Sequence, residues 1–236
     1  MEIVIRKDIG KYMEELRSWL ETQREIPLED MDGFFASRVK IYDEHMSLWK
    51  EAYRVLPDYL PEKVNTILDL GIGTGLELEA IYRKFPSVSV TGIDLSRAML
   101  DELERKYPDR KFTAVCGDYF EENFGPDYDA VVSVESLHHF SPTEKGKLYR
   151  KIYHSLKRSG TFLLCDYIAC CEEEETLLAE ECMRKKKAQG ISDGELVHFD
   201  TPLTLARELS LLRAAGFVSA EAVNSIEGAT IIVSVK

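Results

Sequence analysis

The spacing of hydrophobic residues changes near residue 60. Before that point apolar side chains recur every three or four residues, which predicts amphipathic helices over 8–24 and about 30–57, separated at Pro27. The apolar positions are Ile9, Tyr12, Met13, Leu16 and Leu20 in the first helix, and Phe34, Phe35, Val39, Tyr42, Met46, Trp49 and Tyr53 in the second. Pro57 and Pro61 end this helical region.

After residue 60, short apolar runs alternate with helical patterns. The predicted strands are 64–70, 88–94, 111–116, 130–134 and 161–167, and the predicted helices between them are 76–85, 97–106 (capped by Ser96) and 143–156, with a turn at 157–160. Repeated strand–helix units indicate a mostly parallel sheet with helices on both faces. The sequence therefore predicts an α/β domain over 61–236, preceded by an N-terminal helical cap over 1–60.

The alternation stops between residues 168 and 201. Acids at 172–175 open a predicted helix and Lys185, Lys186 and Lys187 lie near its end. This order complements the helix dipole, so we interpret both charge runs as solvated helix ends. This insert follows the fifth strand, at the edge where open α/β sheets bind ligands, so we expect a lid that carries substrate specificity. A helix over 202–215 and two strands over 217–223 and 229–235, close enough to pair antiparallel, complete the chain.

Candidate chemistry begins where the first strand ends. That strand finishes in Asp69, and Gly71, Gly73 and Gly75 follow at every second position. The second strand, about twenty residues later, ends in Asp94. Glycines allow close approach of a ligand to the backbone, and an acid in this place can accept both hydroxyls of a ribose. The pattern predicts a nucleoside-binding site.

These segments resemble the class I S-adenosylmethionine-dependent methyltransferases. The similarity is carried by Ile67-Leu68-Asp69-Leu70-Gly71-Ile72-Gly73-Thr74-Gly75, Val90-Thr91-Gly92-Ile93-Asp94-Leu95-Ser96, Cys116-Gly117-Asp118-Tyr119, Tyr128-Asp129-Ala130-Val131-Val132-Ser133 with Leu137-His138-His139-Phe140, and Leu156-Lys157-Arg158-Ser159-Gly160-Thr161. It covers roughly 60–168 and 202–236. The resemblance implies a Rossmann-like sheet of seven strands with an antiparallel last strand, S-adenosylmethionine as cofactor and a small-molecule methyl acceptor.

The resemblance also implies a set of cofactor-binding residues. The methionyl end would lie on the glycine loop, Asp94 would hold the ribose, and Asp118 would accept from the adenine amino group unless it only caps the next segment. The whole expected set is Asp69, Gly71, Gly73, Thr74, Gly75, Asp94, Leu95, Met99, Gly117, Asp118, Tyr119 and Glu135, with Arg38 and Tyr42 from the cap. Arg38 would pair with the methionyl carboxylate and Tyr42 would close over the site, with ordinary helix packing as the alternative for both.

Methyl transfer from a sulfonium is an in-line displacement, so the protein mainly aligns donor and acceptor. A base is needed only if the nucleophile arrives protonated. His138 and His139 follow the fourth strand near the expected acceptor, and one of them is a candidate base or pocket wall. Glu135 and His198 are weaker candidates for the same role.

Composition narrows the class of protein. With 236 residues, a formal net charge of −12 and no apolar run long enough to span a bilayer, the chain predicts neither a nucleic-acid nor a membrane partner. The N-terminus lacks the apolar segment of a signal peptide, and five irregularly spaced cysteines do not resemble a disulfide framework, so we expect a cytoplasmic protein. We expect Cys116 and Cys165 to be buried at strand ends. No metal site is expected, because Cys170, Cys171 and Cys182 lack the usual spacing. The apolar cap helices can equally form a homodimer contact.

Three functions other than methyl transfer to a small molecule stay open. A nicotinamide-dependent oxidoreductase uses a similar acid, although the glycines run G-x-G-x-G and no hydride-transfer pair is evident. A relative that modifies the cofactor, such as a carboxy-S-adenosylmethionine synthase, would need basic residues, for which Arg184, Lys185 and Arg207 are candidates. A binding module would keep the glycine loop and Asp94 without turnover.

Overall fold

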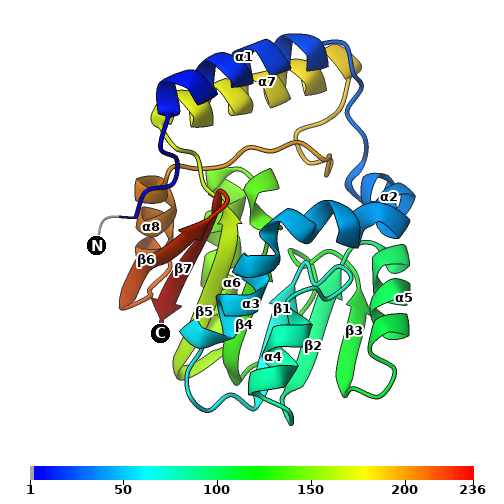
Figure 1. Ribbon diagram of the computed structural model, residues 1–236, viewed down its shortest axis with the longest axis vertical. Coiled ribbons are helices and arrows are strands. Elements are labelled where there is room, and N and C mark those ends of the chain that lie inside the picture. The colour runs from blue at the N-terminus through cyan, green and yellow to red at the C-terminus, as the bar shows by residue number, and fades with distance from the viewer. Residues whose placement is uncertain (1–2) are drawn as a thin grey trace.

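The computed structural model describes residues 3–236, which form a seven-stranded sheet covered by helices on both faces (Figure 1). The strands are β1 (Thr66–Leu70), β2 (Ser89–Asp94), β3 (Phe112–Cys116), β4 (Tyr128–Val134), β5 (Leu156–Tyr167), β6 (Ser219–Ile226) and β7 (Ala229–Val235), in the spatial order β3-β2-β1-β4-β5-β7-β6. Only β7 runs antiparallel to its neighbours, β5 and β6. The predicted sheet and its antiparallel last strand are confirmed.

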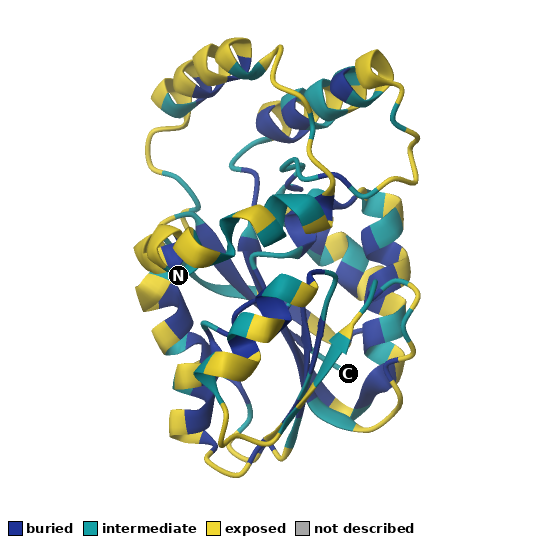
Figure 2. Ribbon diagram, turned by 90° about the vertical axis from the view of Figure 1, so that its right-hand side faces the viewer, coloured by how far each residue is buried: buried dark blue, intermediate teal, exposed yellow. Residues whose placement is uncertain are grey.

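Helices cover both faces of this sheet. They are α3 (Lys50–Val55), α4 (Leu78–Lys84) and α5 (Arg97–Lys106) on one face, and α6 (Pro142–Ser155) and α8 (Leu205–Ala214) on the other. Each helix turns its apolar side to the strands, as Ile81 of α4 and Ile152 of α6 do, and Figure 2 shows buried strands between helices that are exposed on their outer sides. The core therefore consists of two apolar layers separated by the sheet.

Two long helices form a third layer above the carboxyl ends of the parallel strands. Helix α1 (Ile9–Gln23) lies along α7 (Glu172–Gln189), although the two are far apart in sequence (Figure 1). Met13, Leu16 and Leu20 of α1 pack against Leu178 of α7. Helix α2 (Met31–His45) lies between this layer and the sheet, and a 3₁₀ turn, η1 (Met46–Trp49), separates it from α3.

Several sequence predictions need local correction. The second predicted helix is interrupted at η1 and ends in a second 3₁₀ turn, η2 (Leu56–Tyr59). Strand β5 begins at Leu156 and passes through the predicted turn, with Ser159 at a φ of 63°. Ser96 precedes α5, but its hydroxyl makes no capping hydrogen bond. Cys116 is exposed, because β3 is an edge strand, whereas Cys165 is buried as predicted.

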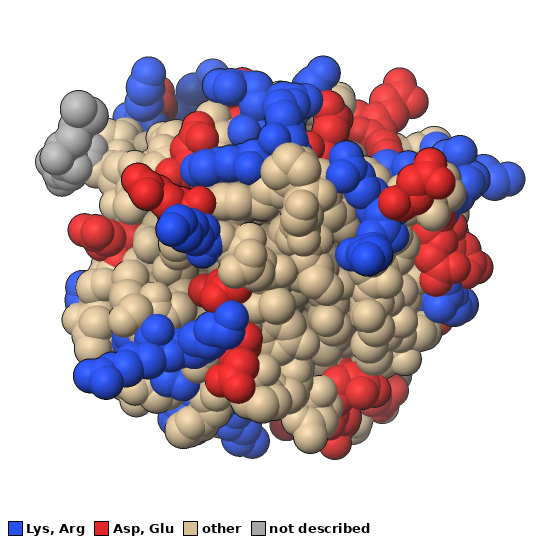
Figure 3. All heavy atoms as spheres, turned by 90° about the horizontal axis from the view of Figure 1, so that it is seen from below, with Lys and Arg blue, Asp and Glu red and all other residues tan. Residues whose placement is uncertain are grey.

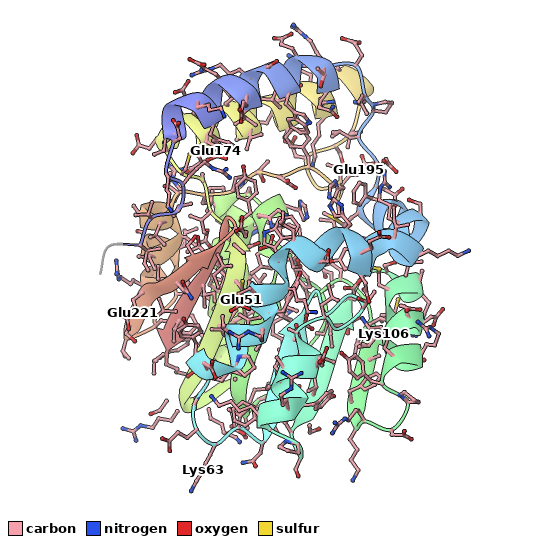
Figure 4. All side chains as sticks on the ribbon, viewed as in Figure 1. Glu51, Lys63, Lys106, Glu174, Glu195 and Glu221 are labelled. Carbon is pink, nitrogen blue, oxygen red and sulfur yellow. The ribbon has the colours of Figure 1, made fainter. Side chains whose placement is uncertain are left out.

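The charge runs of α7 are not simply solvated. Glu174 is buried and accepts hydrogen bonds from the hydroxyls of Tyr12 (2.5 Å) and Tyr167, and Figure 4 places it beneath the α1–α7 layer. Lys185 is also buried and donates to the carbonyl oxygens of Gln23 and Ile26, both at 2.6 Å. These polar contacts attach α1 to α7 and to the end of β5, so part of each charge run joins helices rather than facing water.

Candidate active site

A pocket lies where β1, β2 and β4 end, at the carboxyl edge of the sheet. Its walls come from the glycine loop, the acidic turns after β2 and β3, the loop after β4, and helix α2. The lining residues are Met31, Asp32, Phe35, Tyr42, Gly71, Gly73, Asp94, Leu95, Ser96, Met99, Gly117, Asp118, Tyr119, Glu135, Ser136, His139, Phe140 and Leu196. Most of the cofactor-binding residues expected from the sequence meet here, and we call this space the cofactor pocket.

The glycine loop has the backbone conformation that its sequence predicts. Gly71, Gly73 and Gly75 have φ angles of 74°, 51° and 71°, a region that residues with a Cβ rarely adopt. A Cβ on Gly71 would lie 2.1 Å from the Ser136 hydroxyl oxygen, so this close approach also requires glycine. The loop thereby presents bare backbone to the cofactor pocket.

Asp94 joins this loop to the end of β2. One carboxylate oxygen accepts the Gly73 N–H at 2.8 Å and the other accepts the Ser96 N–H at 2.9 Å. Burial raises the pKa of Asp94, and the two backbone donors oppose that shift. Each carboxylate oxygen has a second lone pair, so Asp94 can still accept hydrogen bonds from a bound diol.

Asp69, Thr74 and Gly75 lie outside the cofactor pocket. Asp69 is buried behind the loop, where desolvation and the neighbouring Glu77 raise its pKa well above the usual value. Thr74 donates its hydroxyl proton to Asp43 at 2.6 Å, and Gly75 faces the packed side chain of Leu103. The contacts of these three residues shape the loop, and their direct contact with the cofactor stays a prediction from the sequence.

The expected adenine end of the pocket is formed by the turn after β3. Asp118 lines the pocket while one of its oxygens accepts the Phe120 N–H at 2.8 Å, so both roles considered for it are sterically compatible. Met99 and Tyr119 are buried apolar walls, and the Tyr119 hydroxyl lies 3.2 Å from that of Ser136. Gly117 and Leu95 complete this end.

The two cap residues differ in position. Tyr42 lines the cofactor pocket, and its ring comes within 4.0 Å of where a Cβ on Gly73 would be. Arg38 does not reach this pocket, because Glu29 binds its guanidinium through two hydrogen bonds of 2.7 and 3.0 Å and the Phe34 ring lies 3.8 Å below it. The structure therefore does not support Arg38 as a partner of the methionyl carboxylate.

A second cavity adjoins the cofactor pocket between the sheet edge and the cap. It is lined by Arg6, Tyr12, Phe34, Phe35, Arg38, Ile41, Tyr42, His45, Met46, Trp49, Glu135, His138, His139, Tyr167, His198, Asp200, Glu227, Gly228 and Ala229. Phe35, Tyr42, Glu135 and His139 line both spaces. We call this second space the acceptor cavity.

Two histidines and two aspartates form a cluster beside the shared wall. His138 Nδ1 lies 2.6 Å from Asp166 Oδ1, and His138 Nε2 lies 3.5 Å from Asp200 Oδ1. The same Asp200 oxygen lies 3.4 Å from His139 Nδ1. Although burial alone would lower it, the two carboxylates raise the pKa of His138 well above its ordinary value. Burial and the charge of His138 lower the pKa of His139.

Glu135 stands beside this cluster on the loop after β4. It has a φ of 48°, and its Oε1 is buried without a hydrogen-bond partner among residues 3–236. Burial raises the pKa of its carboxyl to about 8, opposed by His138 and reinforced by Asp166 and Asp200. Glu135 is thus a half-buried acid facing both cavities.

Sequence reasoning missed Asp166 and Asp200. Asp166 is the second-last residue of β5, and the rule that places ligands at the carboxyl ends of parallel strands was a usable signal for it. Asp200 lies in an irregular segment, and nothing in its local sequence marks it. His198, a weak candidate base, stacks on Phe34 with ring centroids 3.4 Å apart.

Surface charge and hydropathy agree with the composition. On the face seen from below, opposite the α1–α7 layer, Figure 3 shows acidic and basic side chains interspersed around an uncharged area rather than a continuous basic surface. Among residues 3–236, no helix combines the length and apolar character needed to cross a bilayer.

This pocket and fold define a nucleoside-cofactor-binding α/β protein. Comparison with known proteins narrows the class: residues 67–160 match the sequence model of a family described as "Methyltransferase domain". The malonyl-[acyl-carrier protein] O-methyltransferase of Priestia megaterium is 26% identical over 56% of this chain and 49% of its own length. The carboxy-S-adenosyl-L-methionine synthase of Nautilia profundicola is 27% identical over 81% of this chain and 84% of its own length.

A crystal structure of a putative O-methyltransferase from Nostoc punctiforme shares the fold. It superposes with a TM-score of 0.69 at 20% identity, covering 97% of this chain and 68% of that one. The chain therefore carries a match to a methyltransferase domain at residues 67–160 and shares the fold of that solved structure, and its cofactor is taken up below with its activity. It spans about half the length of the Priestia relative, so activity and substrate are taken up below as proposals.

Proposed function

We propose that this protein transfers the methyl group of S-adenosylmethionine to a small molecule bound in the acceptor cavity. The observation that carries the proposal is the wall of Phe35, Tyr42, Glu135 and His139, which the cofactor pocket and the acceptor cavity share. A donor in one space and an acceptor in the other meet at this wall, and in-line transfer requires that proximity.

The reaction is a single displacement. A lone pair of an acceptor heteroatom forms the new bond to the methyl carbon while the sulfur–carbon bond breaks, and that electron pair stays on sulfur to give S-adenosylhomocysteine. A protonated acceptor also loses one proton, which passes to a neighbouring basic group. His139 borders both spaces and is the candidate for this contact, and His138 lies directly beside it.

The cavity walls indicate the acceptor's character. Phe34, Phe35, Trp49 and Tyr167 supply aromatic surface, while the histidines and Asp200 supply polar contacts at one end. This combination suits a compact acceptor with an apolar or aromatic body and a nucleophilic hydroxyl, thiol or amine.

Cofactor and acceptor are tested together. The protein is incubated with S-adenosylmethionine labelled in its methyl group and with panels of phenols, thiols and amines, and mass spectrometry follows both products. We expect S-adenosylhomocysteine and one labelled acceptor in equal amounts, and both should fall strongly in His139→Ala. Stoichiometric binding of the cofactor with no transfer to any class would contradict the proposal.

A second candidate is modification of the cofactor itself. It is favoured by the Nautilia relative, which aligns over 84% of its length and is named a carboxy-S-adenosyl-L-methionine synthase. The basic residues first considered for it are engaged elsewhere: Arg184 pairs with Glu181, Arg207 pairs with Glu175, and Lys185 is bound by carbonyls. Arg6, which lines the acceptor cavity, is the remaining candidate to hold a carboxylate. Formation of a carboxylated cofactor in the same mass spectra would identify this activity.

We also infer a cytoplasmic location and a possible homodimer. Five cysteines without disulfides suit a reducing compartment. Ile41 and Leu48 are exposed on the second helical segment, at 60% and 61%, and provide an apolar surface for a second copy. Fractionation and sedimentation of the full chain test these two inferences.

A further inference from the structure

We propose that His138, His139 and Asp200 form a binding site for a borderline divalent transition-metal ion of the Zn²⁺ type, at the wall between the cofactor pocket and the acceptor cavity. Two imidazoles and one carboxylate are a ligand set that such ions accept, with positions left open for a substrate atom. One potential ligand atom from each residue lies within 4.8 Å of the others. Sequence spacing does not indicate this site, since about 60 positions separate the histidines from Asp200.

The distances fit a common centre. Asp200 Oδ1 lies 3.5 Å from His138 Nε2 and 3.4 Å from His139 Nδ1. Ligands about 2.1 Å from a tetrahedral ion are separated by about 3.4 Å. Both imidazole nitrogens lie within 3.5 Å of one carboxylate oxygen, and His139 Nδ1 also lies 3.2 Å from the Phe199 carbonyl oxygen, so an ion bound here would replace that hydrogen bond.

The surrounding residues would orient the ligands. His138 Nδ1 is 2.6 Å from Asp166, which leaves Nε2 for the ion, the arrangement in which a carboxylate fixes a metal-binding histidine. Thr201 donates its backbone N–H to the His138 carbonyl at 2.8 Å and so holds the segment of Asp200 against that of the histidines. The ligands therefore lie on the segment after β4 and on a loop that is hydrogen-bonded to it.

Unpartnered oxygens provide an independent indication of a missing cation. Among residues 3–236, Glu135 Oε1 and Asp166 Oδ2 are buried without a hydrogen-bond partner, and a second possible ligand group joins these two residues to His138. Glu135 also faces the cofactor pocket, where the positive charge of S-adenosylmethionine could compensate the carboxylate. Asp166 lines neither space. An ion beside His138 would compensate this excess of carboxylates.

The ion would activate the acceptor in the proposed methyl transfer, and its catalytic use rests on that proposal. An acceptor hydroxyl or thiol bound at an open position would become more acidic and lose its proton to water. The anion would then bond to the methyl carbon while the sulfur–carbon bond breaks and its electron pair stays on sulfur. In that case the ion, rather than a free imidazole, prepares the nucleophile. Binding of the ion itself does not depend on the proposed function.

The test is titration of the full-length protein, after chelator treatment and dialysis, with Zn²⁺ by calorimetry and with Co²⁺ by visible absorption. We expect one site, with Co²⁺ d–d bands and no thiolate charge-transfer band. Affinity should fall at least about a hundredfold in Asp200→Asn and His139→Gln, and roughly ten- to a hundredfold in Asp166→Asn. The triple variant Cys170→Ser, Cys171→Ser, Cys182→Ser is the matched control and should bind as the wild type does.

Two results would overturn the proposal: no binding of either ion, or binding that survives Asp200→Asn and is lost in the cysteine variant. Melting temperature and S-adenosylhomocysteine binding are measured for each variant, so that misfolding is recognised. Ion binding without S-adenosylhomocysteine binding would refute the proposed function and leave the metal site standing. Methyl transfer that is unaffected by chelator would refute the catalytic use of the ion and leave the proposed function standing.

Discussion

Asp94 accepts a hydrogen bond from the backbone N–H of Gly73 at 2.8 Å, so the acid that ends β2 directly holds the glycine loop that follows β1. One residue thus shapes the loop and offers its remaining lone pairs to the pocket. Loop geometry and cofactor affinity are coupled at this contact, and substitutions in the loop should separate into those that affect binding and those that affect folding.

Substitutions of Gly73 and Gly75 should separate effects on binding from effects on folding. A Cβ on Gly73 would meet nothing closer than Met99 at 3.7 Å, whereas one on Gly75 would lie 2.5 Å from Leu103 in the core. We expect Gly75→Ala to lower the free energy of unfolding by about 1–3 kcal/mol through overpacking. Gly73→Ala should lose roughly tenfold in S-adenosylhomocysteine affinity with a smaller loss of stability, about 1 kcal/mol for its positive φ. Urea unfolding and calorimetry on both variants check this, and equal stability losses would contradict it.

Glu77 makes stability depend on pH. It is buried beside Asp69, with Asp94 and Lys106 nearby, and burial raises its pKa to about 7. The pKa of such a carboxyl is higher in the folded protein than in the unfolded one. Its contribution to stability is complete at pH values below the unfolded-state pKa and is lost as pH rises through the folded-state pKa, about 7. The free energy of unfolding should therefore fall between pH 5 and pH 8, which urea titrations measure.

Glu77→Gln should reduce that dependence, because the amide does not ionise, while Asp69 and Glu135, whose pKa values are also raised, keep part of it. The matched control is Glu79→Gln on the same helix, whose side chain is exposed and pairs with Arg83 at the surface. The control should retain the wild-type slope. A slope unchanged in Glu77→Gln would show that another group is responsible.

Removing one partner of a buried ion pair between α6 and α8 should strongly destabilise the fold. Lys145 Nζ lies 3.0 Å from Glu208, both side chains are fully buried, and the Tyr149 hydroxyl also donates to Glu208. Lys145→Met leaves the carboxylate without its cation and should cost about 3–5 kcal/mol of unfolding free energy. Addition of Glu208→Gln should recover most of the loss, and an additive double variant would contradict this reading.

Tyr42 should contribute to cofactor affinity through its ring. It covers the glycine loop at the boundary of the two spaces. We expect Tyr42→Ala to weaken S-adenosylhomocysteine binding by roughly tenfold or more, since burying a large apolar side chain contributes about 1.5–3 kcal/mol. Tyr42→Phe should stay close to wild type, as should Leu48→Ala, which is exposed and lines neither space. Equal losses in all three variants would exclude a specific role for the ring.

Local sequence was sufficient to predict the sheet and the cofactor pocket. Strand periodicity, the three glycines and Asp94 are encoded within short stretches, and the structure places Asp94, Asp118 and Tyr42 around one pocket. Only the histidines of the cluster around His138 could be predicted from the sequence, because its acids come from the end of β5 and from a loop that returns over the sheet. The ion pair of Arg38 could not be predicted, because helical spacing gives the face of Arg38 but not Glu29, which lies before the helix and binds it.

The most direct test of the central claim is calorimetric titration with S-adenosylhomocysteine, for the wild type and for Asp94→Ala. We predict binding to the wild type, weakened roughly tenfold or more in the variant, because a hydrogen bond to a carboxylate contributes about 1.5–3 kcal/mol. Absence of binding to the wild type, with heat on titration of NAD instead, would contradict the assignment of the cofactor and favour an oxidoreductase.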